Sequence, residues 1–253
     1  MVTPHPRLSL EGHVARIVLD RPERHNALGA ADLAAFRAHL ATVEADPSIR
    51  VLVLTGSGAD TFCSGASLDQ IASGEMSGRI FETLTEDLAA SRVPTICALN
   101  GSVYGGGTEI ALCCDFRIGV HGTRMAVPAA RLGICYPASG LGRFVDAIGP
   151  AATRRVMLAG EELDAQQMLA TGFVDRLVAR EELGTTTDAL AQRLAGLAPL
   201  AIQAMKRILR GISAGALDAG EVEELVRRCE ASEDLREGLL ARREGRPAEF
   251  RGR

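Results

Sequence analysis

The residues with the clearest chemical potential lie in the segment 100–114, where three consecutive glycines precede a single acid. Glycine lacks a Cβ, so Gly105, Gly106 and Gly107 allow a ligand to approach bare backbone. If a helix begins at Gly106, the N–H of that residue has no partner inside the helix and can receive a developing negative oxygen. Glu109 lies three residues further on, on the same helical face. The segment therefore predicts a carboxylate and an anion-stabilising amide facing one small volume.

A second amide donor is expected upstream of the glycines. A short helix over 67–72 would leave free N-terminal amides that begin near Ala66. A structural alternative exists for the glycine segment, because Gly-rich turns between a strand and a helix are common. In that alternative the glycines only permit close packing, and Glu109 is solvated. Both interpretations stay open on these residues alone.

The elements that would position these groups alternate between strands and helices. A loosely alternating segment over 7–20 predicts a hairpin, and the apolar run 50–56 predicts a strand buried on both faces. Apolar residues at helical spacing mark 31–46 and 78–91, and a short strand over 95–99 leads into the glycines. This repetition predicts right-handed crossovers with their loops gathered along one side.

The C-terminal part of the chain is predicted to be helical. Asp164 and Gln167 fit a capping box, Gly172 fits the end of that helix, and 173–178 is expected to be the last strand. Helices are then expected over 181–197, 199–210, 217–230 and 232–244. Because this tail has no sheet of its own, it must bury its apolar stripes against the core or a neighbouring subunit. We expect a core over 1–198 and a helical oligomerisation region over 199–253.

Composition excludes several classes of function. The 253 residues carry Lys+Arg 28 against Asp+Glu 32, a net charge of −4 that does not suggest a nucleic-acid surface. Charged residues interrupt the apolar stretches, so no membrane span is expected, and the N-terminus lacks an apolar signal core, which predicts a cytoplasmic protein. The six cysteines show no metal-ligand spacing, so no metal is expected; a reactive cysteine is the alternative.

Several motifs occur together, in order and at a familiar spacing. They are Arg21–Leu28 (RPERHNAL), Phe62–Leu68 (FCSGASL), Asn100–Glu109 (NGSVYGGGTE), Cys114–Asp115 and Arg131–Ile134 (RLGI). Each motif is weak alone, but the ordered set is specific. The chain resembles the crotonase superfamily, the enoyl-CoA hydratase/isomerase family, across almost its full length.

The resemblance implies a fold, a substrate class and an assembly. It implies an α/β fold whose core is a spiral of ββα turns, followed by an α-helical trimerisation region, in a homotrimer or homohexamer. The implied substrate is an acyl-CoA thioester of the kind found in fatty acid metabolism, with no separate cofactor because coenzyme A is part of the substrate. The family's oxyanion hole, two backbone N–H groups, maps onto Ala66 and Gly106.

The sequence departs from its relatives at a position that matters for catalysis. The resemblance implies two glutamates in hydratases; Glu109 matches the first, but Ala129 stands at the second. Adding water requires a base for the water and an acid for Cα, so ordinary hydratase chemistry lacks one carboxylate. Glu109 alone could shuttle a proton, or Tyr136 could enter the pocket as a proton donor. Packing is the alternative role for Tyr136.

Coenzyme A binding is implied at two groups of residues. Arg24, Ala27, Ala66, Ser67 and Leu68 match family positions near the adenosine and pantetheine, although Ser67 stands where relatives commonly have Asp. Lys206 and Phe250 are expected to reach the nucleotide of a neighbouring subunit. Arg24 and Lys206 have a plain alternative as solvated surface cations.

These observations lead to one principal hypothesis and two alternatives. The principal hypothesis is an enoyl-CoA hydratase/isomerase type enzyme that stabilises a thioester enolate. The first alternative is a lone-Glu enzyme catalysing double-bond migration, decarboxylation or C–C cleavage of an acyl-CoA. The second is a non-catalytic CoA-binding member of the family.

Overall fold

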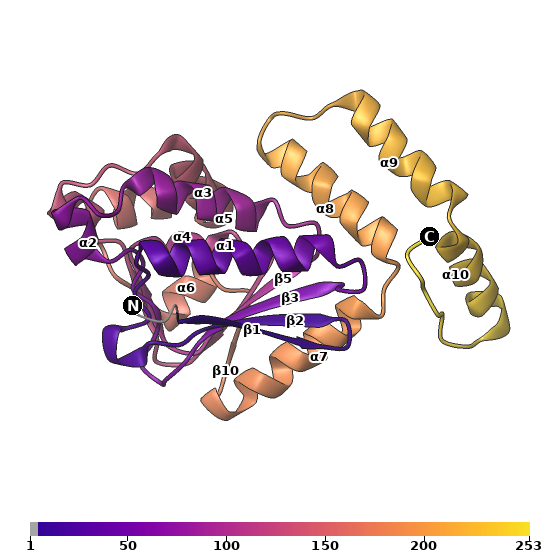
Figure 1. Ribbon diagram of the computed structural model, residues 1–253, viewed down its shortest axis with the longest axis horizontal. Coiled ribbons are helices and arrows are strands. Elements are labelled where there is room, and N and C mark those ends of the chain that lie inside the picture. Colours follow the sequence, from indigo (N-terminus) through magenta and orange to yellow (C-terminus); the bar gives the residue numbers. More distant parts are fainter. Residues whose placement is uncertain (1–4) are drawn as a thin grey trace.

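Two β-sheets with helices around them make up the described part of the chain, residues 5–253, in the computed structural model (Figure 1). Residues 1–4 lie outside the described residues; they begin the N-terminal segment from which a cytoplasmic protein is predicted. The helices cover both faces of the larger sheet, and the last three stand to one side.

The larger sheet has six strands, and all neighbours beyond its first hairpin are parallel. In spatial order they are β1 (Pro6–Glu11), β2 (Val14–Leu19), β3 (Val51–Gly56), β5 (Thr95–Leu99), β7 (Phe116–Val120) and β10 (Arg176–Val178). The expected hairpin and the expected strands over 50–56 and 95–99 are confirmed. The last strand is shorter than predicted, because the Val174 N–H donates to the Met168 carbonyl at 3.2 Å instead of pairing in the sheet.

The smaller sheet contains the second strand of each consecutive strand pair. Its order is β4 (Thr61–Cys63), β6 (Ser102–Tyr104), β8 (Arg124–Ala126) and β9 (Leu163–Asp164). The pairs β3/β4, β5/β6 and β7/β8 each send one strand to each sheet, and a helix follows each pair. These helices are α2 (Leu68–Ser73) with α3 (Gly78–Ala89), α4 (Gly106–Leu112) and α5 (Ala138–Met157). The chain therefore repeats a ββα unit, as expected.

Two helices cover the faces of the larger sheet, and their contacts explain its continuous apolar strands. Alternate residues of a strand point to opposite faces, so Val51 and Val53 join the cluster under α7 (Leu183–Ala195), while Leu52 and Leu54 join the main core. Helix α1 (Ala30–Ala45) packs on β1 and β2, and α7 lies across the other face (Figure 1). The prediction that 50–56 is buried on both faces is confirmed.

A short helix, α6 (Ala165–Thr171), begins and ends as the sequence predicts. The Asp164 side chain accepts the Gln167 N–H at 2.8 Å, and the Gln167 side chain accepts the Asp164 N–H at 2.9 Å. Gly172 follows in the left-handed conformation, where glycine carries no steric penalty. Single 3₁₀ turns, η1 (Pro22–Arg24), η2 (Ala129–Leu132) and η3 (Arg180–Glu182), complete the core.

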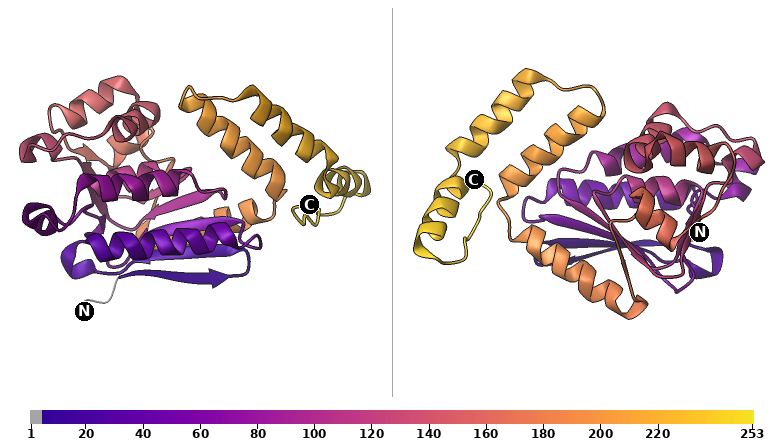
Figure 2. Two further views of the ribbon diagram at one scale, coloured as in Figure 1. Left: turned by 45° about the horizontal axis from the view of Figure 1, so that its top comes forward. Right: turned by 180° about the vertical axis from the view of Figure 1, so that it is seen from behind.

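Residues 199–253, which we call the helical arm, stand apart from the two sheets (Figures 1 and 2). The arm consists of α8 (Pro199–Ser213), α9 (Ala219–Ala231) and α10 (Glu233–Glu244), close to the expected helices. Helix α8 buries only Ala204, and α9 buries no residue. Large apolar side chains are instead exposed, among them Met205, Leu209 and Leu239.

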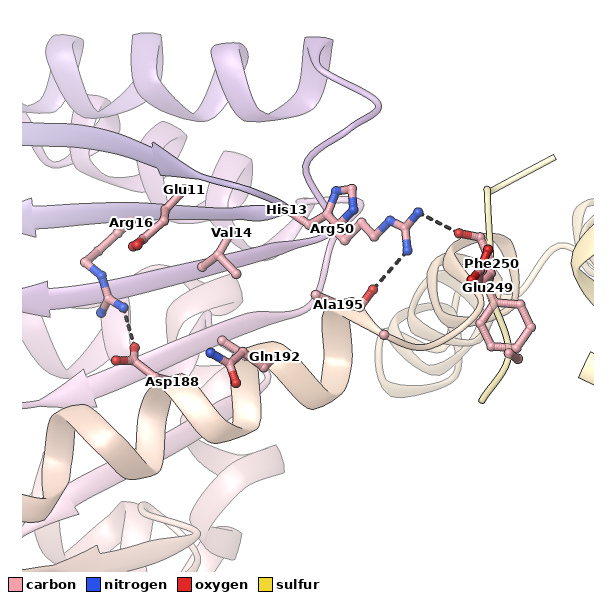
Figure 3. A pocket seen from close by; sticks show the side chains of 13 residues that line it. Glu11, His13, Val14, Arg16, Arg50, Asp188, Gln192, Ala195, Glu249 and Phe250 are labelled. Atoms are coloured by element: carbon pink, nitrogen blue, oxygen red, sulfur yellow. Dashed lines mark hydrogen bonds and ion pairs between the residues drawn. The ribbon is translucent and has the colours of Figure 1, made fainter. Parts of the chain in front are cut away.

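Polar contacts tie the end of the arm back to the rest of the chain. The Arg50 guanidinium donates to the carbonyl of Ala195 at 3.0 Å and to that of Phe250 at 2.8 Å (Figure 3). Within the arm, buried Asp234 of α10 accepts the backbone N–H groups of Arg251 at 2.7 Å and Gly252 at 2.9 Å. The last residues therefore fold back along α10 and end beside the core.

Candidate active site

Two loops meet where the parallel strands β4 and β6 end. Because these strands are parallel neighbours in the smaller sheet, the segments that follow them, 64–66 and 105–106, leave the same edge. The backbone N–H groups of Ala66 and Gly106 have no hydrogen-bond partner within residues 5–253. The structure thus brings both amides proposed from the sequence to one edge of one sheet.

Glycine is required where these two loops touch. A Cβ on Gly65 would overlap the backbone nitrogen of Gly106, and Gly65 also has a φ of +87°. A Cβ on Gly107 would overlap the Cys63 carbonyl oxygen. Backbone can approach this closely only where no side chain intervenes. The glycine run therefore does serve close packing, and that packing is what sets the two amides side by side.

A third segment fixes the position of the Ala66 loop. The Leu28 N–H donates to the Gly65 carbonyl at 2.8 Å, and the Ser67 N–H donates to the Leu28 carbonyl at 2.8 Å. These two bonds flank Ala66 and leave its own N–H unused. They also bring Ala27 next to the loop, as the resemblance implies.

A cavity of about 390 Å³ opens at these loops and is mostly apolar. Its wall includes Ala66, Gly106, Glu109, Ala129 and Tyr136, all of which the sequence analysis singled out. Its other apolar lining residues include Leu68, Ile71, Phe81, Leu132, Ile134 and Pro137. An apolar pocket with a few convergent polar groups is the usual form of a small-molecule site.

Glu109 is the buried acid of this cavity. It lies in the first turn of α4 with only 3 % of its surface exposed. One of its oxygens, Oε1, accepts from Arg143 Nη1 at 2.6 Å and from Thr85 Oγ1 at 3.1 Å. Burial raises the pKa of Glu109, while the Arg143 charge and the Thr85 hydroxyl oppose that rise. The solvated alternative for Glu109 is therefore wrong.

Tyr136 borders the same cavity beside Glu109. Its ring packs edge-on against Phe144, with centroids 6.2 Å apart, so the packing role is real. Burial and the charge of Glu109 both raise the pKa of Tyr136, which keeps the phenol neutral. A neutral phenol can donate a proton and cannot act as a base near neutral pH.

Ala129 presents only a methyl group to the cavity, from the start of η2. The other carboxylate on the cavity wall is Glu82, which accepts a hydrogen bond from the Ser139 hydroxyl at 3.0 Å. The side chain at position 129 thus offers neither an acid nor a base.

Most residues proposed for coenzyme A binding lie in an adjoining groove of about 370 Å³. Arg24, Ala27, Ser67 and Leu68 line it, and Leu68 also borders the main cavity. Arg24 is exposed and forms an ion pair with Asp69 at 3.3 Å. Within one chain, these residues form a continuation of the site.

Lys206 and Phe250 lie elsewhere in the chain. Lys206 Nζ donates to Asp115 Oδ2 and to the Val93 carbonyl, both at 2.7 Å. Phe250 lines a separate cavity of about 540 Å³ between the core and the arm, shown in Figure 3, in which Arg16 pairs with Asp188. Contact of either residue with a neighbour's nucleotide stays a prediction.

The sequence analysis missed Arg143 and Thr85. They reach Glu109 from α5 and α3, 34 and 24 positions away along the chain, and no short motif links them. A weak signal exists: Thr85 lies one helical turn from Phe81, which lines the cavity, and Arg143 lies one turn from Gly140, which lies against Glu109.

Two further observations bear on the expected absences. Among residues 5–253, no group of three or more His, Cys, Asp or Glu side chains is arranged to hold a metal ion. In the same range, no helix is both long enough and apolar enough to cross a bilayer.

Comparison with known proteins gives consistent matches. The family model described as Enoyl-CoA hydratase/isomerase matches residues 9–253. Carnitinyl-CoA dehydratase from Proteus mirabilis is 35% identical over 97% of this chain and 98% of its own. The 2,3-dehydroadipyl-CoA hydratase of Escherichia coli is 34% identical with the same coverage.

Solved structures with the same arrangement include two that cover nearly the whole chain. An enoyl-CoA hydratase/isomerase family protein from Hyphomonas neptunium has a TM-score of 0.92 at 30% identity, covering 98% of each chain. An enoyl-CoA hydratase/carnithine racemase from Magnetospirillum magneticum has a TM-score of 0.93 at 28% identity, covering 100% of this chain and 97% of its own.

Proposed function

The chain belongs to the enoyl-CoA hydratase/isomerase family, the crotonase superfamily, and we propose that it is an acyl-CoA hydratase/dehydratase in which Glu109 performs the proton transfers alone. The observation that carries this proposal is the meeting of two unpartnered amides and one buried carboxylate at an apolar cavity. The names of the relatives support the reaction class, because hydration and dehydration are one reaction in opposite directions.

The amides of Ala66 and Gly106 are the proposed oxyanion hole. Polarising a thioester carbonyl moves charge onto its oxygen, and two N–H groups aimed at that oxygen stabilise the enolate. Loss of one such donor typically costs on the order of 3 kcal/mol in the transition state. The glycines that hold the two loops together make this pair of donors rigid, so little reorganisation is needed during the reaction.

Glu109 is the proposed proton carrier. In the hydration direction it accepts a proton from water as the water oxygen bonds to Cβ, and the double-bond electrons move toward the thioester oxygen. Protonated Glu109 then returns that proton to Cα as the enolate collapses. The sum is addition of H and OH across one double bond, with the carboxylate unchanged. A single carboxylate on one side of the substrate delivers both groups to the same face.

Ala129 supports a second candidate function. It stands where the resemblance places the second glutamate of hydratases, and its methyl group cannot activate water. Double-bond migration needs only one carboxylate, which takes a proton from Cγ and returns it to Cα. Decarboxylation or C–C cleavage would use the same enolate. Tyr136, held neutral, is the proposed additional proton donor for any of these reactions.

We propose that coenzyme A enters along the groove of Arg24, Ala27, Ser67 and Leu68, with the acyl chain in the apolar cavity. The exposed apolar side chains of the helical arm support assembly through it, in a homotrimer or homohexamer. In that assembly Lys206 and Phe250 would approach a neighbouring subunit's nucleotide.

The Glu109→Gln variant tests the proposal. Wild type and variant are assayed with 2-enoyl-CoA, 3-enoyl-CoA and 3-hydroxyacyl-CoA thioesters of graded chain length. General acid–base catalysis contributes about 10²- to 10⁴-fold, so kcat should fall by that order in the variant. Glu161→Gln is the matched control, because Glu161 pairs with Arg155 at the surface, away from the cavity, and should keep wild-type turnover.

The pattern of substrates separates the candidates. Turnover of 2-enoyl-CoA supports hydration, whereas turnover of 3-enoyl-CoA without water addition supports double-bond migration. Calorimetric binding of acyl-CoA without any turnover would support a non-catalytic member. Unchanged turnover in Glu109→Gln would remove Glu109 from the mechanism.

A further inference from the structure

Arg143 lies behind Glu109, away from the cavity. It belongs to α5, and its side chain reaches between α3 and α4 with 14 % of its surface exposed. The residues that form the cavity wall do not include it. Its Nη1 binds Glu109 Oε1 at 2.6 Å and its Nη2 binds Glu86 Oε1 at 2.7 Å, so the guanidinium joins the buried acid to an exposed one.

These contacts treat the two oxygens of Glu109 differently. Oε1 receives both the Arg143 guanidinium and the Thr85 hydroxyl, while Oε2 has no hydrogen-bond partner among the described residues. Among residues 5–253, the side-chain oxygens that are fully buried and lack a hydrogen-bond partner are those of Ser57 and Thr187. Oε2 of Glu109 is not one of them, so this unpartnered oxygen is not fully buried and keeps access to the cavity that Glu109 lines.

The approach of α5 also fixes where the carboxylate can lie. A Cβ on Gly140 would be 3.0 Å from Glu109 Oε1 and 3.2 Å from Oε2, so the helix backbone lies directly against the carboxylate. Gly140 on one side and Thr85 on the other leave little room for rotation. Because two hydrogen bonds hold Oε1, Oε2 should face the substrate in every molecule.

Charge acts in the same direction as geometry. Burial in an apolar wall favours the neutral acid, which could not accept a proton. The Arg143 cation opposes this effect by favouring the ionised carboxylate. None of the other titratable groups around the carboxylate is a cation; they are Glu86 and Glu82 from α3, Cys113 at the end of α4 and Tyr136 before α5. Arg143 is the cation paired with this acid in the described chain.

We propose that Arg143 is a positioning residue that keeps Glu109 ionised, with Oε1 anchored and Oε2 directed at the substrate. This inference rests on the proposed function, since it assigns a base to that reaction. It also explains how one carboxylate can work where a second is missing. A lone base must be ionised at the start of each cycle, and the adjacent guanidinium secures this without touching the substrate.

A purely structural ion pair is the competing explanation, and Arg155 illustrates it. Arg155 lies on the same helix and pairs with Glu161. These two side chains are 47 % and 37 % exposed, and neither lines the active-site cavity. Surface pairs of that kind contribute little to stability. The pair Arg143–Glu109 differs because its acid is buried in a cavity wall and only one oxygen is bound.

The experiment compares Arg143→Gln, Arg143→Lys and the control Arg155→Gln. The first readout is the pH profile of kcat and KM with an enoyl-CoA that wild type turns over. The second is a pH titration of the protonated Glu109 carboxyl band by infrared difference spectroscopy, assigned by its loss in Glu109→Gln. The second readout needs no turnover, so it tests Arg143 even if the substrate is wrong.

Glu109 as a base must be ionised, so activity falls as the pH drops through its pKa. In Arg143→Gln the acid limb of the profile and the infrared titration should both move to higher pH. On that limb kcat should fall about tenfold or more, with KM within about twofold. Arg143→Lys, which keeps the charge but not the planar fork, should recover part of the loss. Arg155→Gln should match wild type.

Failure of this inference can be told apart from failure of the proposed function. A Glu109 titration that stays in place in both Arg143 variants would overturn the role of Arg143, whatever the turnover. If Arg143→Gln fails to fold, Arg143→Ala takes its place, and an unmoved titration with wild-type kcat at every pH in that variant overturns the role equally. A titration that moves in a protein without turnover supports the role of Arg143 and rejects the proposed reaction.

Discussion

The core and the helical arm satisfy their apolar side chains in opposite ways. In the core, large side chains such as Phe36, Phe62 and Phe144 are fully buried between the sheets and helices. In the arm, Leu209 is 64 % exposed and Leu239 is 63 % exposed, although α8 is strongly amphipathic in sequence. The core therefore contains its own hydrophobic driving force, whereas the arm presents apolar side chains that the described chain leaves exposed.

The contacts at the junction fit this difference. Arg50 donates to the carbonyls of Ala195 and Phe250, and Lys206 of α8 donates to Asp115 and to the Val93 carbonyl, so polar contacts join the arm to the core. Such bonds fix a direction but contribute modestly to stability. We infer that the core determines whether the chain folds, and that the arm determines what the folded chain associates with.

The largest expected effect comes from a cavity in the core. Phe36→Ala removes a fully buried ring from the core-facing side of α1, and it should lower the free energy of unfolding by about 3–5 kcal/mol. Leu239→Ala, on the exposed face of α10, should change that value by less than about 0.5 kcal/mol at a concentration where the protein is monomeric. Urea denaturation measures both. Equal losses would contradict the distinction between the two regions.

A charge on the arm should affect assembly more than folding. Leu209→Glu places a carboxylate in the exposed apolar face of α8 and should shift the protein to the monomer in sedimentation velocity, with a cost on the order of 2 kcal/mol or more per interface. Leu158→Glu is the matched control, because Leu158 is 76 % exposed on the core. An assembly that survives the first change and dissociates with the second would reverse our assignment.

The smallest effect is expected from acid. Burial acts to raise the pKa of Asp32, but hydrogen bonds from His5 and the Gly29 N–H, with the His5 charge, lower it overall. Its stabilisation is therefore present above the unfolded pKa of about 3.9 and is lost as the pH falls through the lower folded value. Asp32→Asn should lose about 1–3 kcal/mol at neutral pH and show a flatter decline in acid, measured by thermal unfolding against pH.

A carboxylate on the arm supplies the contrast for that measurement. Arg246, with the Glu249 N–H, lowers the pKa of Glu237 to about 2, yet this ion pair lies at the surface. Glu237→Gln should loosen residues 246–253 in hydrogen exchange and leave the unfolding of the core unchanged. Should it instead reproduce the acid profile of Asp32→Asn, core and arm would be energetically one unit.

Local patterns were sufficient for the fold and for part of the site. A continuous apolar run identified β3, helical apolar spacing identified α3 and the arm, and the order of five motifs identified the family. The glycine run and Glu109 were legible because backbone exposure and an acid on one helical turn are local properties. Their catalytic roles, and those of Arg24, Lys206 and Tyr136, stay predictions.

What the sequence did not reveal depends on contacts between distant segments. Arg143 meets Glu109 only because α5 returns beside α4, and a single arginine in a helix carries no mark of its partner. The burial of His5 against Asp32 is similar, since it joins the residue before β1 to α1 across 27 positions. Neither contact follows from spacing, because each requires the relative placement of whole elements.

The overlap that any side chain would cause at Gly65 or Gly107 also limits how this protein can diversify. A side chain at either glycine would push the two strands apart, so we expect substitutions in this part of the cavity wall to be eliminated by selection. The part of the wall contributed by Ile71, Leu132 and Ile134 carries no such restriction, because these side chains lie outside the glycine contacts and are not proposed to transfer protons. Randomised libraries confined to these three positions should yield altered acyl preference while the chemistry is retained, and libraries at the glycines should yield none.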